Sequence, residues 1–268
     1  MTAPSGGSGS QLLPVTPALG VAMAVLLAAG VAAAGWGRLG HGRAVLRAGL
    51  RAVVQLAAVA AVIAWVVRSL PLSLLFVLLM FTVAVRTAGR RMTAGPNWVW
   101  AAAPIAAGVA PVLVLLVAAG LLPLKGISLI PVAGILIGGA LTATSLSGRR
   151  ALDELAQRRG EVEAALSLGL TDRDARLEIC RTAAATSLMP ALDQTRTVGL
   201  VTLPGAFVGM LLGGASPVAA GAVQLFVLVA LLAVEAVAVL VVLELVGRGL
   251  VPGAAPVARE PGAGPHIR

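Results

Sequence analysis

Long apolar stretches separated by short polar ones dominate the hydrophobic pattern of the chain. A helix needs about 20 mostly apolar residues to cross a bilayer. The segments that meet this description are 17–36, 51–67, 70–85, 97–122, 127–146, 197–214 and 217–246. The pattern predicts an all-α, polytopic membrane bundle of about seven transmembrane helices, forming one transmembrane domain over residues 17–247.

The positions of Lys and Arg predict how the bundle is oriented. If the N-terminus lies outside, 18 of the 20 basic residues fall in inside segments, and only Arg68 and Lys125 fall outside. Inside loops of membrane proteins carry an excess of basic residues. We therefore expect an N-out/C-in, multi-pass protein of the cell (plasma or inner) membrane.

The two ends of the chain have the composition of linkers. Gly, Ser, Thr and Pro are frequent near the start, and Pro, Gly and Ala near the end. Such segments bury too little apolar surface to fold. The composition predicts disordered tails over residues 1–16 and 248–268.

Composition excludes several classes of function. The chain is 59% hydrophobic and only 12% charged, whereas a soluble domain carries about twice as much charge. The pI of about 11.7 does not indicate nucleic-acid binding, because the basic residues separate apolar runs instead of forming a patch. One cysteine excludes a disulfide framework, and two histidines and one cysteine are too few for a tetrahedral zinc site.

Motifs for nucleotide hydrolysis and for common hydrolases are absent from the sequence. A phosphate-binding Gly-x4-Gly-Lys-Ser/Thr loop does not occur, and Lys125 is the only lysine. The HExxH and GxSxG motifs are absent too. We expect neither an enzyme nor a cofactor.

Residues 147–182 form the only long polar stretch and hold seven of the eleven acidic residues. Gly160 and Gly169 bracket a short amphipathic helix over 161–168. A solvated cytoplasmic loop is one interpretation of this segment. A helix that inserts into a groove of a cytosolic partner is the other.

Two local signals support helices in this segment. Glu154 and Arg158 are spaced as an i,i+4 ion pair. Thr171 and Asp174 resemble a capping box that opens a second helix.

The spacing Glu163-Ala164-Ala165, then Gly169, then Ile179, resembles the EAA-x3-G-x9-I loop of ABC-transporter permeases. The proline that usually follows is absent until Pro190. The resemblance implies that this coupling loop seats on a cytosolic ABC ATPase subunit. The docking residues that it implies are Glu163, Ala164, Ala165, Leu166 and Gly169.

Residues 45–247 resemble the FetB-type permease family, the membrane subunit of an iron-export ABC transporter, to which plant aluminium-tolerance half-transporters also belong. The motifs that carry the resemblance are Arg51-Ala52-x-x-Gln55-Leu56, Ile130-Pro131-Val132-Ala133-Gly134, Ala165-Leu166-Ser167-Leu168-Gly169 and Thr197-Val198-Gly199-Leu200-Val201-x-Leu203-Pro204-Gly205. The resemblance implies a homodimeric permease in membrane lipid, driven by a separate ATPase and exporting a metal ion. Where this family carries amide side chains, the chain has Gly139 and Val83.

Polar groups inside apolar segments are candidates for a transport pathway. Glu235 lies within the last segment, and an ionisable group there costs at least ~2.5–3.5 kcal/mol. It either faces a lumen, where it binds a cation or relays a proton, or faces another helix and bonds to it. Gln55 and Gln224 are neutral but also need partners. Glu244 is explained by an i,i+4 pair with Arg248.

A further candidate lies before the sixth segment, just after Pro190, which lacks an amide hydrogen and should kink its helix. Asp193 and Arg196 are i,i+3 neighbours, and Thr197 follows. They form either a headgroup-level salt bridge or a cytoplasmic gate.

Helix packing and helix breaks give the last set of candidates. Small residues four apart let helix backbones approach closely, as in a dimer interface, and prolines near span ends free carbonyls. The residues concerned are Gly134 and Gly138, Gly205 and Gly209, and Pro131 and Pro204.

The residues themselves identify no metal site, so any metal ligand is unknown and iron follows from the resemblance alone. Three alternatives therefore stay open. The chain could be an ATP-independent secondary transporter or channel that uses Glu235, an ABC permease for a non-metal substrate, or a scaffold that docks a regulatory protein.

Overall fold

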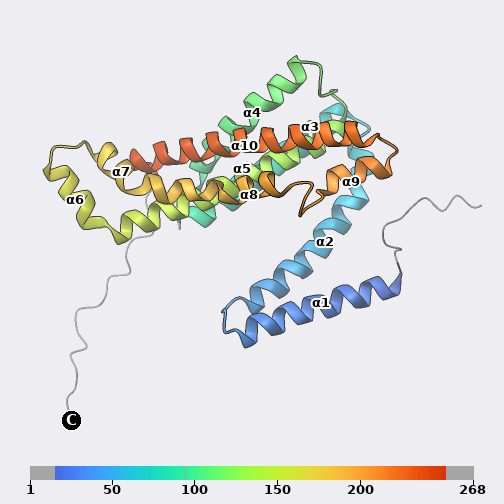
Figure 1. The fold of residues 1–268 in the computed structure, drawn as a ribbon, viewed down its shortest axis with the longest axis horizontal. Coiled ribbons are helices and arrows are strands. Elements are labelled where there is room, and N and C mark those ends of the chain that lie inside the picture. The colour runs from blue at the N-terminus through green and yellow to red at the C-terminus, as the bar shows by residue number, and fades with distance from the viewer. Residues whose placement is uncertain (1–15, 94, 252–268) are drawn as a thin grey trace, which may run out of the picture. The chain divides into compact units, whose positions relative to one another are not determined.

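The computed structural model describes residues 16–93 and 95–251. The predicted tails, 1–16 and 248–268, lie almost wholly outside the described residues. The predicted all-α membrane bundle is confirmed, since the described residues are helical apart from turns and one isolated bridge between Val198 and Thr202. The helices, drawn in Figure 1, are α1 Pro17–Trp36, α2 Gly42–Val66, α3 Leu70–Met92, the 3-10 helix η1 Pro96–Ala101, α4 Ala102–Ala118, α5 Gly126–Gln157, α6 Arg159–Ser167, α7 Asp172–Ala185, the 3-10 helix η2 Thr186–Leu188, α8 Met189–Thr197, α9 Gly205–Leu212 and α10 Pro217–Gly247.

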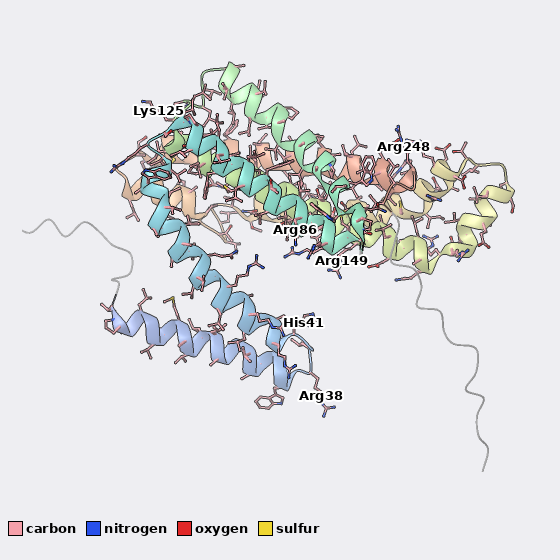
Figure 2. All side chains as sticks on the ribbon, turned by 180° about the vertical axis from the view of Figure 1, so that it is seen from behind. Arg38, His41, Arg86, Lys125, Arg149 and Arg248 are labelled. Atoms are coloured by element: carbon pink, nitrogen blue, oxygen red, sulfur yellow. The ribbon has the colours of Figure 1, made fainter. Side chains whose placement is uncertain are left out.

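The first of two compact units is the hairpin of α1 and α2. Its turn uses positive φ at Arg38 (49°) and Gly40 (69°), a conformation that glycine adopts without strain. Figure 2 shows Arg38 and His41 at this turn. Apolar side chains cover the surface of α1, whereas α2 also carries a polar stripe in its first half, made of Arg43, Arg47, Arg51 and Gln55 at four-residue spacing.

The second unit is built around α5 and α10, which pack along each other. Helix α3 packs on α5, and α4 packs on α10. The core between them contains Ile105, Leu136 and Val234, all at most 2% exposed. In Figure 2, Lys125 lies at one end of this unit, whereas Arg149 and Arg248 lie toward the other end, which is the separation that the predicted orientation requires.

Six helical segments among the described residues are long and apolar enough to cross a membrane. The predicted span 197–214 is not one of them, so this part of the prediction is corrected. Helix α8 ends at Thr197, and α9 has only eight residues. Between them, Gly199 takes a φ of +82°, and Pro204 disfavours a helical conformation of the residue before it.

The return crossing between α7 and α10 is therefore discontinuous. In Figure 1, α7, α8 and α9 follow one another along α10, and each of them contacts it. Pro190 lies at the start of α8, as its missing amide hydrogen predicts. Pro131, by contrast, lies inside an unbroken α5.

Cys180, the only cysteine of the chain, gives a probe of the core. It is fully buried between α5, α7 and α10, and burial raises the pKa of its thiol to about 11. Since the thiolate is the reactive form, we expect native protein in detergent to react with a maleimide dye only as it unfolds. Rapid labelling at neutral pH and low temperature would contradict this placement.

The close crossing of α4 and α10 gives a stability prediction. A Cβ atom at Gly108 would lie 2.7 Å from the backbone oxygen of Val234. Forcing atoms into a packed interface costs about 1–3 kcal/mol. Gly108→Ala should therefore lower the melting temperature, which is measured from the labelling of Cys180. The control is Gly35→Ala on α1, where the added methyl group meets nothing within 4 Å and the melting temperature should stay level or rise.

Candidate functional site

A cavity of about 260 Å³ lies where α5, α8 and α10 meet. Glu235 lines it and is only 9% exposed. The other polar side chains in its wall are Thr142, Ser187 and Gln194. Among the described residues, Glu235 has no hydrogen bond or ion pair, so its carboxyl group is free to bind what enters the cavity.

Gly139 makes room for this carboxyl group. A Cβ atom at Gly139 would lie 2.9 Å from Glu235 Oε1 and 2.6 Å from Leu231 Cδ2. The sequence singled out Gly139 as a position where the resembling family carries an amide. Its location beside Glu235 follows only from the packing of α5 on α10.

The remaining oxygens of the cavity are oriented as acceptors. The Thr142 hydroxyl donates to the backbone oxygen of Gly138 (3.0 Å), and the Ser187 hydroxyl donates to that of Ala184 (2.7 Å). Each hydroxyl proton is used in a local hydrogen bond to a backbone oxygen three or four residues earlier, so each hydroxyl oxygen keeps lone pairs that can act as acceptors. A carboxylate with hydroxyl oxygens is a ligand set for a cation or a proton.

The other pathway candidates do not join this cavity. Arg196 pairs with Asp193 at 3.8 Å, both well exposed, and the Thr197 hydroxyl donates to the Asp193 backbone oxygen at 2.8 Å. The cavity uses their neighbour Gln194 instead. Gln55 is exposed on α2, in the other unit. A gate or pathway role for these four residues stays a prediction.

The predicted packing glycines leave space beside them within this one chain. A Cβ atom at Gly138, Gly205 or Gly209 would meet nothing within 4 Å, and one at Gly134 would meet only the end of the Met80 side chain, at 2.8 Å. Their role in an interface with a second copy stays a prediction. Close approaches occur at other glycines, Gly108 and Gly139 among them, whose spacing in the sequence gave no signal.

Helix α6 is the short helix expected before Gly169, but it starts two residues earlier than predicted, so Gly160 lies inside it and does not precede it. None of its residues is buried, and Glu163 is exposed and paired with Arg159 at 3.2 Å. Arg158 joins Glu154 and Glu161, and its hydrogen bond lowers the pKa of Glu161.

The chain reverses after α6 through Gly169, whose φ of +92° suits glycine. Thr171 caps α7, accepting from the Asp174 amide at 3.2 Å, so the predicted capping is confirmed. Leu168, at the turn, is 83% exposed. The sequence elements of the implied docking region thus lie together on one protruding helix and turn (Figure 1).

A bidentate ion pair joins α7 to the C-terminal end of α10. Arg173 Nε and Nη2 donate to the two carboxylate oxygens of Glu244 at 3.0 and 2.6 Å. Arg248 Nε donates to the same carboxylate at 2.6 Å, which confirms the expected i,i+4 pair. These hydrogen bonds raise the pKa of Arg173, with Glu244 the largest cause. Sequence reasoning missed Arg173, which is 71 residues from its partner.

The sequence matches the model of a family described as "Uncharacterised protein family (UPF0014)" over residues 18–251. Rice (Oryza sativa subsp. japonica) "UPF0014 membrane protein STAR2" is 38% identical over 221 residues, 81% of this chain and 75% of the relative. Arabidopsis thaliana "Protein ALUMINUM SENSITIVE 3" is 40% identical over 152 residues, 56% of each chain. Escherichia coli "Probable iron export permease protein FetB" is 28% identical over 194 residues, 71% of this chain and 75% of the relative. No solved structure matches the chain.

The contact between Arg173 and Glu244 gives a prediction about local opening. Arg173→Ala removes both hydrogen bonds that join α7 to α10, so Cys180, two turns along α7, should react with a maleimide a few-fold faster below the melting temperature. Arg159→Ala, which breaks a pair within α6 only, is the matched control. Equal labelling rates in both variants would mean that apolar packing alone holds α7.

Proposed function

The chain belongs to the UPF0014 family of membrane proteins, and from this premise we propose that it is the membrane-spanning permease subunit of an ABC transporter that exports a metal ion. The observation that carries the proposal is the exposed helix α6, with its EAA-type spacing, joined through α7 to the helix that bears Glu235. The FetB relative, whose name reads "Probable iron export permease protein", supports iron as the cargo.

The docking surface of the proposal is α6 with the turn at Gly169. The surface residues are Glu163, Ala164, Ala165, Leu166 and Gly169, to which exposed Leu168 adds an apolar contact. A short helix that projects from the membrane domain fits a groove of a cytosolic ATPase.

Motion of the docked helix reaches the cavity through packed contacts. Helix α6 contacts α7, and α7 packs against both α5 and α10. The Arg173–Glu244 contact adds hydrogen bonds at the same end of α10. Nucleotide binding by the ATPase would then shift α5 and α10 between two arrangements around Glu235, a two-state device biased from outside the membrane.

The pathway of the proposal lies between two copies of the chain. Within one copy, Gly138, Gly205 and Gly209 leave open space, which suits close approach of a second copy. A homodimer with two ATPases would place two Glu235 cavities around one pathway. Carboxylate and hydroxyl oxygens suit a hard or borderline cation, and iron enters as substrate, not as a resident cofactor.

One observation favours a second candidate function. Glu235 is buried beside a cavity and has no partner among the described residues, as expected for the coupling carboxylate of an ATP-independent secondary transporter. In that case Glu235→Gln abolishes proton-dependent flux, and changes in α6 have no effect.

The test is to extract the tagged protein from its own membranes in mild detergent and identify the bound proteins by mass spectrometry. We expect an ABC ATPase with native protein and its loss in Gly169→Trp, because the bulky side chain strains a positive φ and blocks the turn. Gly40→Trp is the matched control, since Gly40 also has positive φ and open space but lies in the α1–α2 turn. If the ATPase is recovered, ferrous iron should stimulate the ATPase activity of the purified complex, which is the next measurement.

The opposite result is equally informative. If no ATPase accompanies a folded native dimer, the ABC assignment is wrong. Glu235→Gln in reconstituted vesicles, assayed with and without a proton gradient, then decides the second candidate.

A further inference from the structure

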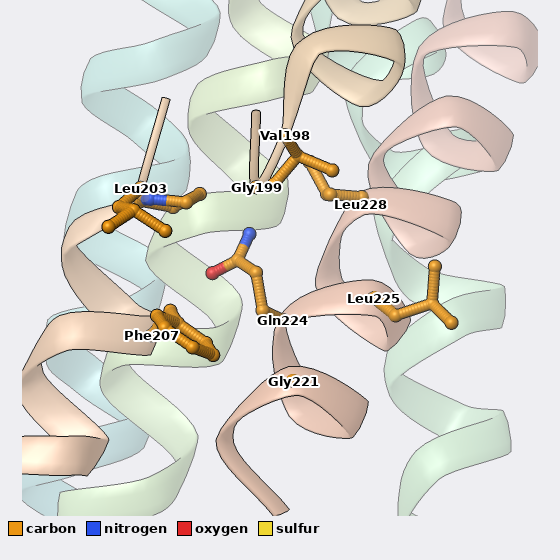
Figure 3. A pocket seen from close by; sticks show the side chains of 9 residues that line it. Val198, Gly199, Leu203, Phe207, Gly221, Gln224, Leu225 and Leu228 are labelled. Carbon is orange, nitrogen blue, oxygen red and sulfur yellow. The ribbon is translucent and has the colours of Figure 1, made fainter. Parts of the chain in front are cut away.

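A second cavity lies beside the first half of α10, next to the broken segment that precedes this helix. It measures about 190 Å³ and is lined by residues of the 198–204 segment, α9 and α10. Figure 3 shows the Gln224 side chain pointing from α10 into this space, toward Leu203 and Phe207. The cavity shares no lining residue with the one at Glu235.

Two glycines explain why this cavity is open. Gly199 takes a φ of +82°, so the chain turns there and does not continue as a helix along α10. On the opposite wall, Gly221 has no side chain to fill the space. A Cβ atom at Gly221 would meet only the ring of Phe207, at 4.0 Å. One wall is therefore bent away, and the other is left bare.

Gln224 is the only polar side chain in the wall of this cavity. It is 6% exposed, and its Oε1 atom has no hydrogen-bond partner in the part of the chain that the structure describes. Burying an amide group without a hydrogen bond costs free energy. The amide is therefore placed where an incoming hydrogen-bonding group stabilises it.

The composition of the wall excludes several occupants. An ion would exchange its hydration for one neutral amide, so the cavity does not suit the cation of the proposed function. A buried water is held by about three hydrogen bonds, and this wall offers a single polar side chain. A lipid acyl chain matches the apolar wall but leaves the amide without a partner.

We propose that this cavity binds a compact apolar molecule, about the size of one aromatic ring, through a single hydroxyl group that hydrogen-bonds to Gln224. A cavity of about 150 Å³ accommodates benzene, so about 190 Å³ leaves room for a ring with one small substituent. The terminal torsion of glutamine is broad and two-fold, so the amide can present either its oxygen or its nitrogen. A hydroxyl group both donates and accepts, and it matches either end.

Binding joins the two sides of the discontinuous crossing. A molecule in the cavity contacts the 198–204 segment and α9 on one side and α10 on the other. A ligand favours the arrangement that it binds better, so it stabilises the one in which the turn lies against α10. This inference goes beyond the proposed function and does not depend on it, because neither an ATPase nor a transported ion takes part.

The test compares two probes of nearly the same shape, para-fluorophenol and para-fluorotoluene, by fluorine NMR on the full-length protein in lipid nanodiscs. Empty nanodiscs give the part of each signal that is due to partition into lipid. The measured quantity is the dissociation constant of the toluene divided by that of the phenol. This ratio should be at least about fivefold larger for native protein than for Gln224→Leu, because only the phenol gains a hydrogen bond.

Two further variants locate the effect. Gly221→Leu places a side chain in the cavity and should abolish saturable binding of both probes. Gln157→Leu is the matched control for the loss of an amide, since Gln157 is exposed at the end of α5 and does not line this cavity. Both of its dissociation constants should equal those of native protein. The Cys180 melting temperature shows that each variant is folded.

Three results overturn the inference. Equal ratios in native protein and Gln224→Leu mean that the amide does not recognise the hydroxyl group. No saturable binding to native protein means that lipid or a second copy fills the cavity. Binding that survives in Gly221→Leu places the ligand elsewhere. None of these results bears on the proposed function, which is decided by recovery of the ATPase.

Discussion

The packing of α10 along α5 is the contact on which the rest of the second unit depends. Both helices exceed 30 residues, or about 45 Å, whereas the hydrocarbon core of a bilayer is about 30 Å thick. Their ends therefore project beyond the membrane and support α7 on one side. Close approach at Gly139 leaves the Glu235 carboxyl group against α5. One helix pair thus supplies the core, the buried carboxyl group and the base of the proposed docking element.

Local sequence features predicted the parts of the fold that local physics controls. Apolar length predicted the long helices, Thr171 predicted the start of α7, and Gly169 predicted the turn before it. The prediction of a continuous span over 197–214 was wrong because hydropathy reports only the polarity of the side chains. Gly199 and Pro204 interrupt the helix through the geometry of the backbone. Within the candidate site, the cost of burying a charge singled out Glu235, which the structure places beside a cavity and whose functional role stays a prediction. The cavity, the nearness of Gly139 and the Arg173–Glu244 contact needed the tertiary packing, since each joins residues far apart in the chain.

The discontinuous return crossing concentrates the irregular features of the molecule. The cavity of Glu235 includes residues from η2 and α8, and the cavity of Gln224 includes the 198–204 segment and α9. A continuous helix in their place would pack evenly against α10 and leave no such spaces. The long helices α5 and α10 form a rigid wall, and the short helices α8 and α9 face it with a backbone that can rearrange. Discontinuous helices beside continuous ones recur in transporters.

The shortness of α9 also constrains how the chain enters the membrane. Eight residues cover only about 12 Å of the bilayer, too little for insertion machinery to accept them as an independent stop in translocation. Four residues separate α9 from α10, whose first turn is capped by Ser216. The two helices therefore partition into lipid together, and the longer helix α10 supplies most of the hydrophobic free energy. Insertion of the sixth crossing is thus completed only after the ribosome has made the last helix, and the cavities that α10 lines form last.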